Sequence, residues 1–184
     1  MKYMQNGNFQ NHSLMRLTVI FTLVFIVGFW ITNFALYFAK MGMTPESVQA
    51  YYLGSEATFT MPKTYQSMLE VTHGHLAMQA LVILFITHLL IFAPYSKNVK
   101  IAFVVCGFSF ALLNEAASWL VRFVDPGFAI LKVFAFMAFQ ATLGFLIFAL
   151  LKFLLTKPKP AQMPKPYMPV QQHSVQKEKN NGVD

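Results

Sequence analysis

Four long apolar runs constrain the fold of this chain more than any other feature. Each is at least as long as the ~20 residues that an α-helix needs to cross a bilayer. Backbone N–H and C=O groups find no water in the bilayer core, so each run has to form a helix. The runs cover residues 17–38, 71–92, 101–124 and 128–155. We therefore predict an all-α integral membrane protein, a four-helix antiparallel bundle whose membrane domain covers residues 17–156.

The composition agrees with lipid as the surrounding solvent. Of the 184 residues, 56% are hydrophobic and only 11% are charged, whereas soluble domains contain about 25% charged residues. The first run is too long for the apolar core of a signal peptide, so we interpret it as an uncleaved span. The single cysteine, Cys106, excludes an internal disulfide and a CxxCH motif. No haem is therefore expected to be bound covalently.

The positively charged residues predict the orientation. They give a net charge of +7 and cluster at the ends of the spans and in the tail, which indicates membrane topology and not nucleic-acid binding. Ten Lys and Arg residues fall on one side and four on the other. The four are Lys40, Lys63, Arg122 and Lys132. Because the richer side is cytoplasmic, we predict that residues 1–16 and 157–184 lie in the cytoplasm and that the loop 40–65 lies outside.

The connecting segments carry helix and turn signals. Residues 44–46 (Thr-Pro-Glu) are typical of a helix start, and Gly54 is typical of a helix end, so we expect a short interfacial helix in the first outer loop. A second start at 60–62 (Thr-Met-Pro) is expected to lead directly into the second span. Residues 125–127 (Asp-Pro-Gly) predict a tight turn. The Pro- and Lys-rich tail 157–184 is expected to be disordered.

Histidines in the second span are the first candidates for a binding site. A helix turns about 100° per residue, so Glu70 and His73, three residues apart, are able to hydrogen-bond. His75 lies roughly 200° round the helix from His73 and shares its own face with Gln79. The sequence leaves open which histidine faces the bundle. A carboxylate that holds one imidazole nitrogen is typical of a histidine that binds a metal or haem.

Polar residues also interrupt the third span at helical spacing. They are Glu115, Ser118, Trp119 and Arg122. At 1.5 Å per residue, Glu115 lies about 13 Å and His75 about 6 Å below the outer interface. An ionisable group at membrane depth costs several kcal/mol unless it is paired. Arg122 is expected to pair with Glu115 or Asp125, or to reach the lipid headgroups. We expect the histidine and carboxylate of the two spans to meet near the outer face, with the other polar residues around them.

The candidate cofactor is a b-type haem or a transition metal. His73 and His75 are the candidate ligands, although a regular helix does not allow both to bind one metal. His88 lies about 22 Å further along the helix and is the candidate for a second haem position. No other span carries a histidine, so the other ligand is a methionine, a vacant position or a residue of a second copy. The candidate methionines are Met43, Met61, Met68, Met78 and Met137. The alternative is that His73 and His88 are ordinary polar residues at the helix ends.

Several segments resemble a group of little-characterised bacterial inner-membrane proteins. These are the tyrosine–glycine segment 51–54, the HxHL segment 73–76, and the SW…PGFA segments 114–119 and 126–129. The resemblance covers residues 51–152 and implies a respiratory setting in the bacterial inner membrane. Longer members of the group carry a c-type haem segment in the first outer loop. This chain departs from that pattern because it lacks CxxCH and has Asn114-Glu115 before the Ser-Trp pair.

The site pattern and the resemblance together predict a role in respiratory electron transfer. The expected partners are membrane lipid, a periplasmic cytochrome or respiratory complex subunit, and a second copy of the chain. One alternative is a cofactor-free accessory or assembly subunit whose outer loop docks a partner. Another is a transporter or proton path through Glu115 and His75, which the lack of inverted repeats disfavours. No nucleophile–base pair is recognisable, so an enzyme acting on its own is not expected.

Overall fold

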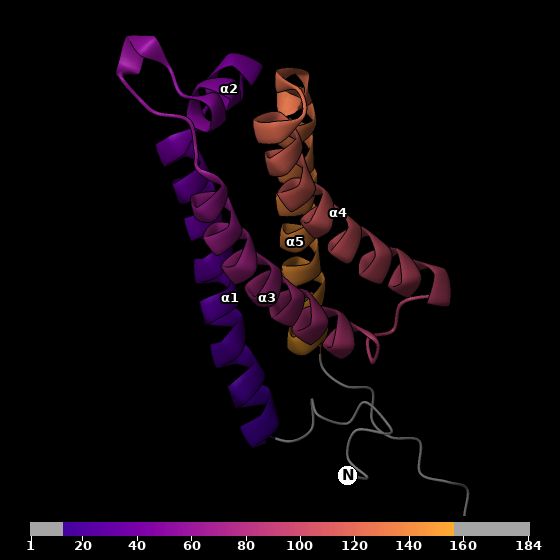
Figure 1. Ribbon diagram of the computed structural model, residues 1–184. Coiled ribbons are helices and arrows are strands. Elements are labelled where there is room, and N and C mark those ends of the chain that lie inside the picture. The colour runs from indigo at the N-terminus through magenta and orange to yellow at the C-terminus, as the bar shows by residue number, and fades with distance from the viewer. Residues whose placement is uncertain (1–12, 157–184) are drawn as a thin grey trace, which may run out of the picture.

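The computed structural model describes residues 13–156, which form helices and turns without a β-strand (Figure 1). The four long helices are α1 (Ser13–Lys40), α3 (Tyr65–Leu90), α4 (Lys97–Phe123) and α5 (Ala129–Leu155). The short helix α2 (Pro45–Leu53) and two 3₁₀ turns, η3 (Glu56–Thr58) and η4 (Pro126–Phe128), connect them at one end. The predicted all-α bundle with a short helix after the first span is confirmed. Residues 1–12 and the tail 157–184, predicted to be cytoplasmic, lie outside the described residues.

All four long helices are long and apolar enough to cross a membrane. Large apolar side chains cover their outer faces, as expected where lipid replaces water. Examples with more than half of their surface exposed are Phe21, Phe25, Phe134, Phe145 and Phe148. The chain is therefore a multi-pass membrane protein.

The ends of α2 follow the local signals in the sequence. The Thr44 hydroxyl accepts a hydrogen bond from the Ser47 amide at 3.3 Å, and Pro45 occupies the first helical position. Gly54 ends the helix with φ = +83°, and a Cβ there would lie 2.5 Å from the carbonyl oxygen of Thr60. Only glycine fits this position without strain.

The predicted start of the second span at residues 60–62 is wrong. Helix α3 begins at Tyr65, where the Thr64 hydroxyl accepts from the Ser67 amide at 3.2 Å. Residues 55–63 instead fold back on α2, because Ser55 and Thr60 form an antiparallel bridge and the Lys63 amide donates to the Tyr52 carbonyl at 3.0 Å. These pairings close a tight loop around η3, so the α-helix cannot start before Tyr65.

Helix α5 is the central helix of the bundle. It packs most extensively on α4 and also contacts α1, α2 and α3. Helix α1 packs on α5 through Trp30, whose Nε1 donates to the Gln140 carbonyl at 3.0 Å. The Trp30 ring also lies against Gly144, where a Cβ would be 2.9 Å from the ring. Helix α3 approaches α4 at Gly107, where a Cβ would lie 3.0 Å from Ile83. Within the described residues, α1 and α3 both contact α5 and make little contact with each other.

Buried apolar side chains form two clusters along the bundle. The larger joins the four long helices around Ile83, Ile86, Leu143, Leu146 and Leu150. The smaller includes Tyr37, Val48, Tyr52, Met68 and Phe136. Val48 of α2 is fully buried in the second cluster, so α2 covers that end of the bundle.

Candidate functional site

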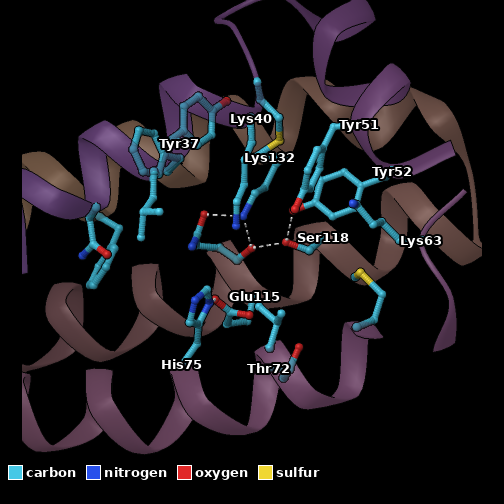
Figure 2. Close-up of a pocket in the computed structure, with 18 of the residues that line it drawn as sticks. Tyr37, Lys40, Tyr51, Tyr52, Lys63, Thr72, His75, Glu115, Ser118 and Lys132 are labelled. Carbon is cyan, nitrogen blue, oxygen red and sulfur yellow. Dashed lines mark hydrogen bonds and ion pairs between the residues drawn. The ribbon is translucent and has the colours of Figure 1, made fainter. Parts of the chain in front are cut away.

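A cavity of about 120 Å³ lies under α2, where the five α-helices meet (Figure 2). Its polar lining is drawn from every helix. It includes Tyr37 of α1, Tyr52 of α2, His75 and Gln79 of α3, Asn114, Glu115 and Ser118 of α4, and Lys132 and Gln140 of α5. Polar groups at membrane depth are costly unless they find partners or serve a ligand.

The first polar group of the cavity joins α3 to α4. The Nδ1 atom of His75 lies 2.8 Å from Oε1 of Glu115, and Nε2 of Gln79 donates to the same oxygen at 3.4 Å. The Glu115 side chain is 7% exposed and that of His75 is 53% exposed. The hydrogen bonds offset part of the cost of burying a carboxylate. Among the described residues the second nitrogen of His75, Nε2, has no hydrogen-bond partner.

A buried lysine forms the second polar group. Lys132, 5% exposed, donates from Nζ to the side-chain oxygen of Asn114 at 2.8 Å and to its carbonyl oxygen at 3.0 Å. Figure 2 shows Lys132 reaching from α5 towards this pair. An ammonium has three N–H donors, so one remains for another group. Glu115 lines the same cavity, so a buried acid and a buried base share this space.

A tyrosine ties α2 to this network. The hydroxyl of Tyr52 donates to Oγ of Ser118 at 3.0 Å, and Ser118 donates to the carbonyl of Asn114 at 3.2 Å. Burial raises the pKa of the Tyr52 phenol above its ordinary value, and the hydrogen bond with Ser118 lowers it less. The phenol is therefore protonated and acts as a donor. Ser118 and Lys132 thus share the Asn114 carbonyl, which links Tyr52 to Lys132 through α4.

Three buried polar atoms of the described chain lack a hydrogen-bond partner, and all three belong to residues that line the cavity. They are the hydroxyl of Tyr37 and the Oε1 atoms of Gln79 and Gln140. An unsatisfied buried polar group costs about 1–3 kcal/mol, and such groups in native proteins usually contact an ordered water or a ligand. Because all three lie around one cavity, we expect the cavity to hold ordered water or a polar ligand.

Comparison with known proteins gives a family and nothing beyond it. A family model described as a transmembrane helical domain matches residues 42–161. The chain belongs to this family, Aq_1264_TM. No curated protein and no solved structure matches. The Aq_1264_TM segment contains α2 to α5, and with them His75, Glu115 and Lys132.

The structure brings four of the predicted site residues together within the Aq_1264_TM segment. His75, Gln79, Glu115 and Ser118 all line the cavity. His75 is therefore the histidine that faces the bundle, because packing of α3 on α4 turns its face, and not that of His73, towards Glu115. This orientation was the alternative that helical spacing left open.

Three other predicted residues of α3 do not join the site. Glu70 is exposed and accepts from Gln66 Nε2 at 2.9 Å, and not from His73. His73 is exposed and does not line the cavity. His88 is exposed in the last turn of α3, where its ring packs edge-to-face with Phe92 at 5.8 Å.

Trp119 and Arg122 lie nearer the end of α4 than the cavity does. Trp119 donates from Nε1 to the hydroxyl of Thr72 at 2.9 Å, and this hydrogen bond joins α4 to α3. Arg122 pairs with neither expected acid, because its Nε donates to the carbonyl of Lys63 at 2.6 Å. The folded-back loop thus binds the guanidinium that was expected to pair with Glu115, and Lys132 is the basic residue that shares the cavity with Glu115.

Sequence reasoning missed several lining residues. The sequence pattern assigns Lys132 only to the outer side and marks Tyr52 only as part of the segment 51–54, and it does not mark Tyr37 or Gln140. The available signal was isolation: Lys132 and Gln140 are single polar residues inside an apolar run, a position that usually marks an inward-facing group.

A metal would find few ligands in the described part of the chain. It contains no group of three His, Cys, Asp or Glu side chains placed to hold an ion. Of the predicted methionine ligands only Met68 lines the cavity, where it is joined by Met41. Besides the Glu115 carboxylate, the lining thus offers a metal His75 Nε2 and the thioethers of Met41 and Met68.

Proposed function

We propose that the protein takes part in respiratory electron transfer in the bacterial inner membrane, and that its cavity holds the redox group near the periplasmic face. The observation that carries the proposal is the hydrogen bond between His75 Nδ1 and Glu115, which leaves Nε2 without a partner. A carboxylate in this position orients an imidazole and makes its second nitrogen more basic. The same pair is able to take up or release a proton when a bound group changes its charge.

The redox group is a haem b, a transition metal or an organic carrier. A metal would be held by His75 with the thioether of Met68 or Met41, and it would supply one-electron chemistry. The cavity of about 120 Å³ is small beside ordinary ligand pockets of ~300–1,000 Å³. A porphyrin therefore fits only if α1 or α3 moves, whereas a single ion or a single organic ring does not need that movement.

The test is purification from native membranes in mild detergent. The reduced-minus-oxidised visible spectrum, a metal analysis and analysis of an organic-solvent extract together cover the three classes of redox group. We expect one of them in stoichiometric amount in the wild type and in the control His73→Ala, and its loss in His75→Ala. A wild type with no chromophore, no metal and no extractable carrier contradicts the proposal.

A second candidate is a cofactor-free accessory or assembly subunit. The observation in its favour is the tip of the first outer loop, where Phe59 is 95% and Met61 is 83% exposed. Such side chains are suited to dock a periplasmic cytochrome or a respiratory complex subunit. If a partner co-purifies with the wild type and with His75→Ala, but not with the double variant Phe59→Ser, Met61→Ser, this candidate is favoured over the first.

A further inference from the structure

We infer that the cavity binds the ring of a quinone or quinol that enters from the lipid between α1 and α3. This inference rests on the proposed function, because it names the redox group. It begins from the mouth of the cavity. Among the lining residues Leu36 of α1 is 54% exposed, Val71 of α3 is 47% exposed, and the side chain of His75 is 53% exposed. The cavity is therefore open on the side where these two helices face each other.

The mouth lies at the depth of lipid chains and not in water. Leu36 is four residues before the end of α1, which places it about 6 Å along the axis from that end. Leu36 and Val71 both belong to predicted membrane spans. A guest that enters here has to tolerate lipid outside and hydrogen bonds inside. This combination describes a polar head on an apolar tail.

The polar groups inside the cavity determine which hydrogen-bond donors and acceptors the polar head must carry. The Oε1 atoms of Gln79 and Gln140 require donors, the Tyr37 hydroxyl takes either role, and Lys132 has one N–H to give. A quinol has two hydroxyls, each of which donates and accepts, and a quinone has two acceptor oxygens.

The size and walls of the cavity suit one flat ring. Tyr37 and Phe136 stack with ring centroids 3.8 Å apart, and Phe139 also lines the space. Apolar cavities of ~150 Å³ hold a benzene ring, and this cavity of about 120 Å³ extends outward through its mouth. A six-membered ring is thus accommodated with its tail between α1 and α3.

The test uses the full-length protein in phosphatidylcholine nanodiscs. The probes are decyl-tailed benzoquinone and naphthoquinone, and the readout is quenching of tryptophan fluorescence, since Trp30 is bonded to Gln140 beside the cavity. We expect saturable quenching. Tyr37→Phe and Gln140→Leu each remove one hydrogen-bonding group, so they should weaken binding ~5- to 10-fold. The matched control Tyr65→Phe removes an exposed hydroxyl outside the cavity and should leave binding unchanged.

The mouth has its own variants. Leu36→Phe and Val71→Phe narrow the entrance and should weaken binding by about tenfold or more. Leu81→Phe is the control, because Leu81 lies on α3, is 63% exposed and does not line the cavity.

Thermal unfolding without quinone separates a ligand site from a purely structural role. The Tyr37 hydroxyl has no internal partner, so Tyr37→Phe should leave the midpoint unchanged or raise it. A drop of several degrees would show that the hydroxyl serves the fold through a bound water, and would overturn the inference.

Quenching that does not saturate, or that all variants share, also overturns the quinone assignment. If the purified protein then carries haem or a metal, the proposed electron-transfer function stands and only the quinone is lost. If it carries no redox group of any kind, both proposals fail.

Discussion

Glu115 is the residue on which the polar network depends. It is hydrogen-bonded to His75 Nδ1, it accepts from Gln79, and it shares the cavity with Lys132. Inside a bundle these interactions are strong because the dielectric constant is low, and for the same reason an unpaired charge is costly. Removing one member of the network therefore leaves the others without compensation.

The first prediction concerns the carboxylate itself. Glu115→Ala should lower the free energy of unfolding by ~3 kcal/mol, because Lys132 loses its counter-charge and two donors lose their acceptor. Glu115→Gln should cost less, because an amide oxygen still accepts from His75. Denaturant unfolding in detergent measures both. Glu70→Ala is the control, since Glu70 is exposed and bonded only to Gln66. A Glu115→Ala variant as stable as the control would contradict this account.

The second prediction tests the coupling between the two buried charges. Lys132→Met and Glu115→Gln should each destabilise the protein, whereas the double variant should lose ~1–2 kcal/mol less than the two single losses combined, because neither charge is left alone. The same unfolding assay completes the cycle. Strict additivity would show that the attraction contributes nothing measurable.

The sequence predicted the site residues that depth and helical spacing mark, and missed those that depend on packing between helices. Depth and helical spacing were enough to mark His75, Gln79, Glu115 and Ser118. They were not enough to choose between His75 and His73, because the rotation of α3 is decided by its packing on α4. The place of Lys132 in the site was not predicted, because its hydrogen bonds to Asn114 join two helices and local sequence patterns do not show contacts between helices.

At the scale of elements, local chemistry predicted what is determined locally. The cap at Thr44 and the glycine at Gly54 define α2 within a few residues. The start of α3 was misplaced because the decisive contacts, between Ser55 and Thr60 and between Lys63 and Tyr52, bring together residues that only the folded loop makes neighbours. The Lys63 carbonyl of this loop also accepts from Arg122, so the path of the loop keeps the guanidinium from pairing with Glu115.

The third prediction compares two glycines in different settings. Gly54→Ala should destabilise the protein by ~1–3 kcal/mol, because φ = +83° and the close Thr60 carbonyl leave no room for a Cβ. It should also make the loop 55–63 more sensitive to protease. Gly74→Ala should be neutral or stabilising by up to ~1 kcal/mol, since nothing lies within 4 Å and the site is inside a helix. Equal effects of the two substitutions would contradict the description of the α2 end.

At the scale of the whole molecule, the cavity depends on α1, all of which lies outside the matched family segment 42–161. Helix α1 supplies Tyr37 to the interior and Leu36 to the mouth. It is held on α5 through Trp30 and the small surface at Gly144. Helices α4 and α5 thus carry the buried charged residues Glu115 and Lys132, and α1 closes the space around them on one side.

The fourth prediction concerns orientation, which governs whether the cavity faces the periplasmic leaflet. Lys97, Lys100 and Lys152 lie at the end opposite α2, and the positive-inside rule predicts that this end lies in the cytoplasm. In a Cys106→Ala background, a membrane-impermeant maleimide applied to intact spheroplasts should label Met61→Cys, because Met61 is 83% exposed beyond α2. Ser96→Cys, exposed between α3 and α4, should be labelled only after lysis. The reverse pattern would turn the molecule over and move the site to the cytoplasmic leaflet, where a periplasmic cytochrome would no longer be a fitting partner.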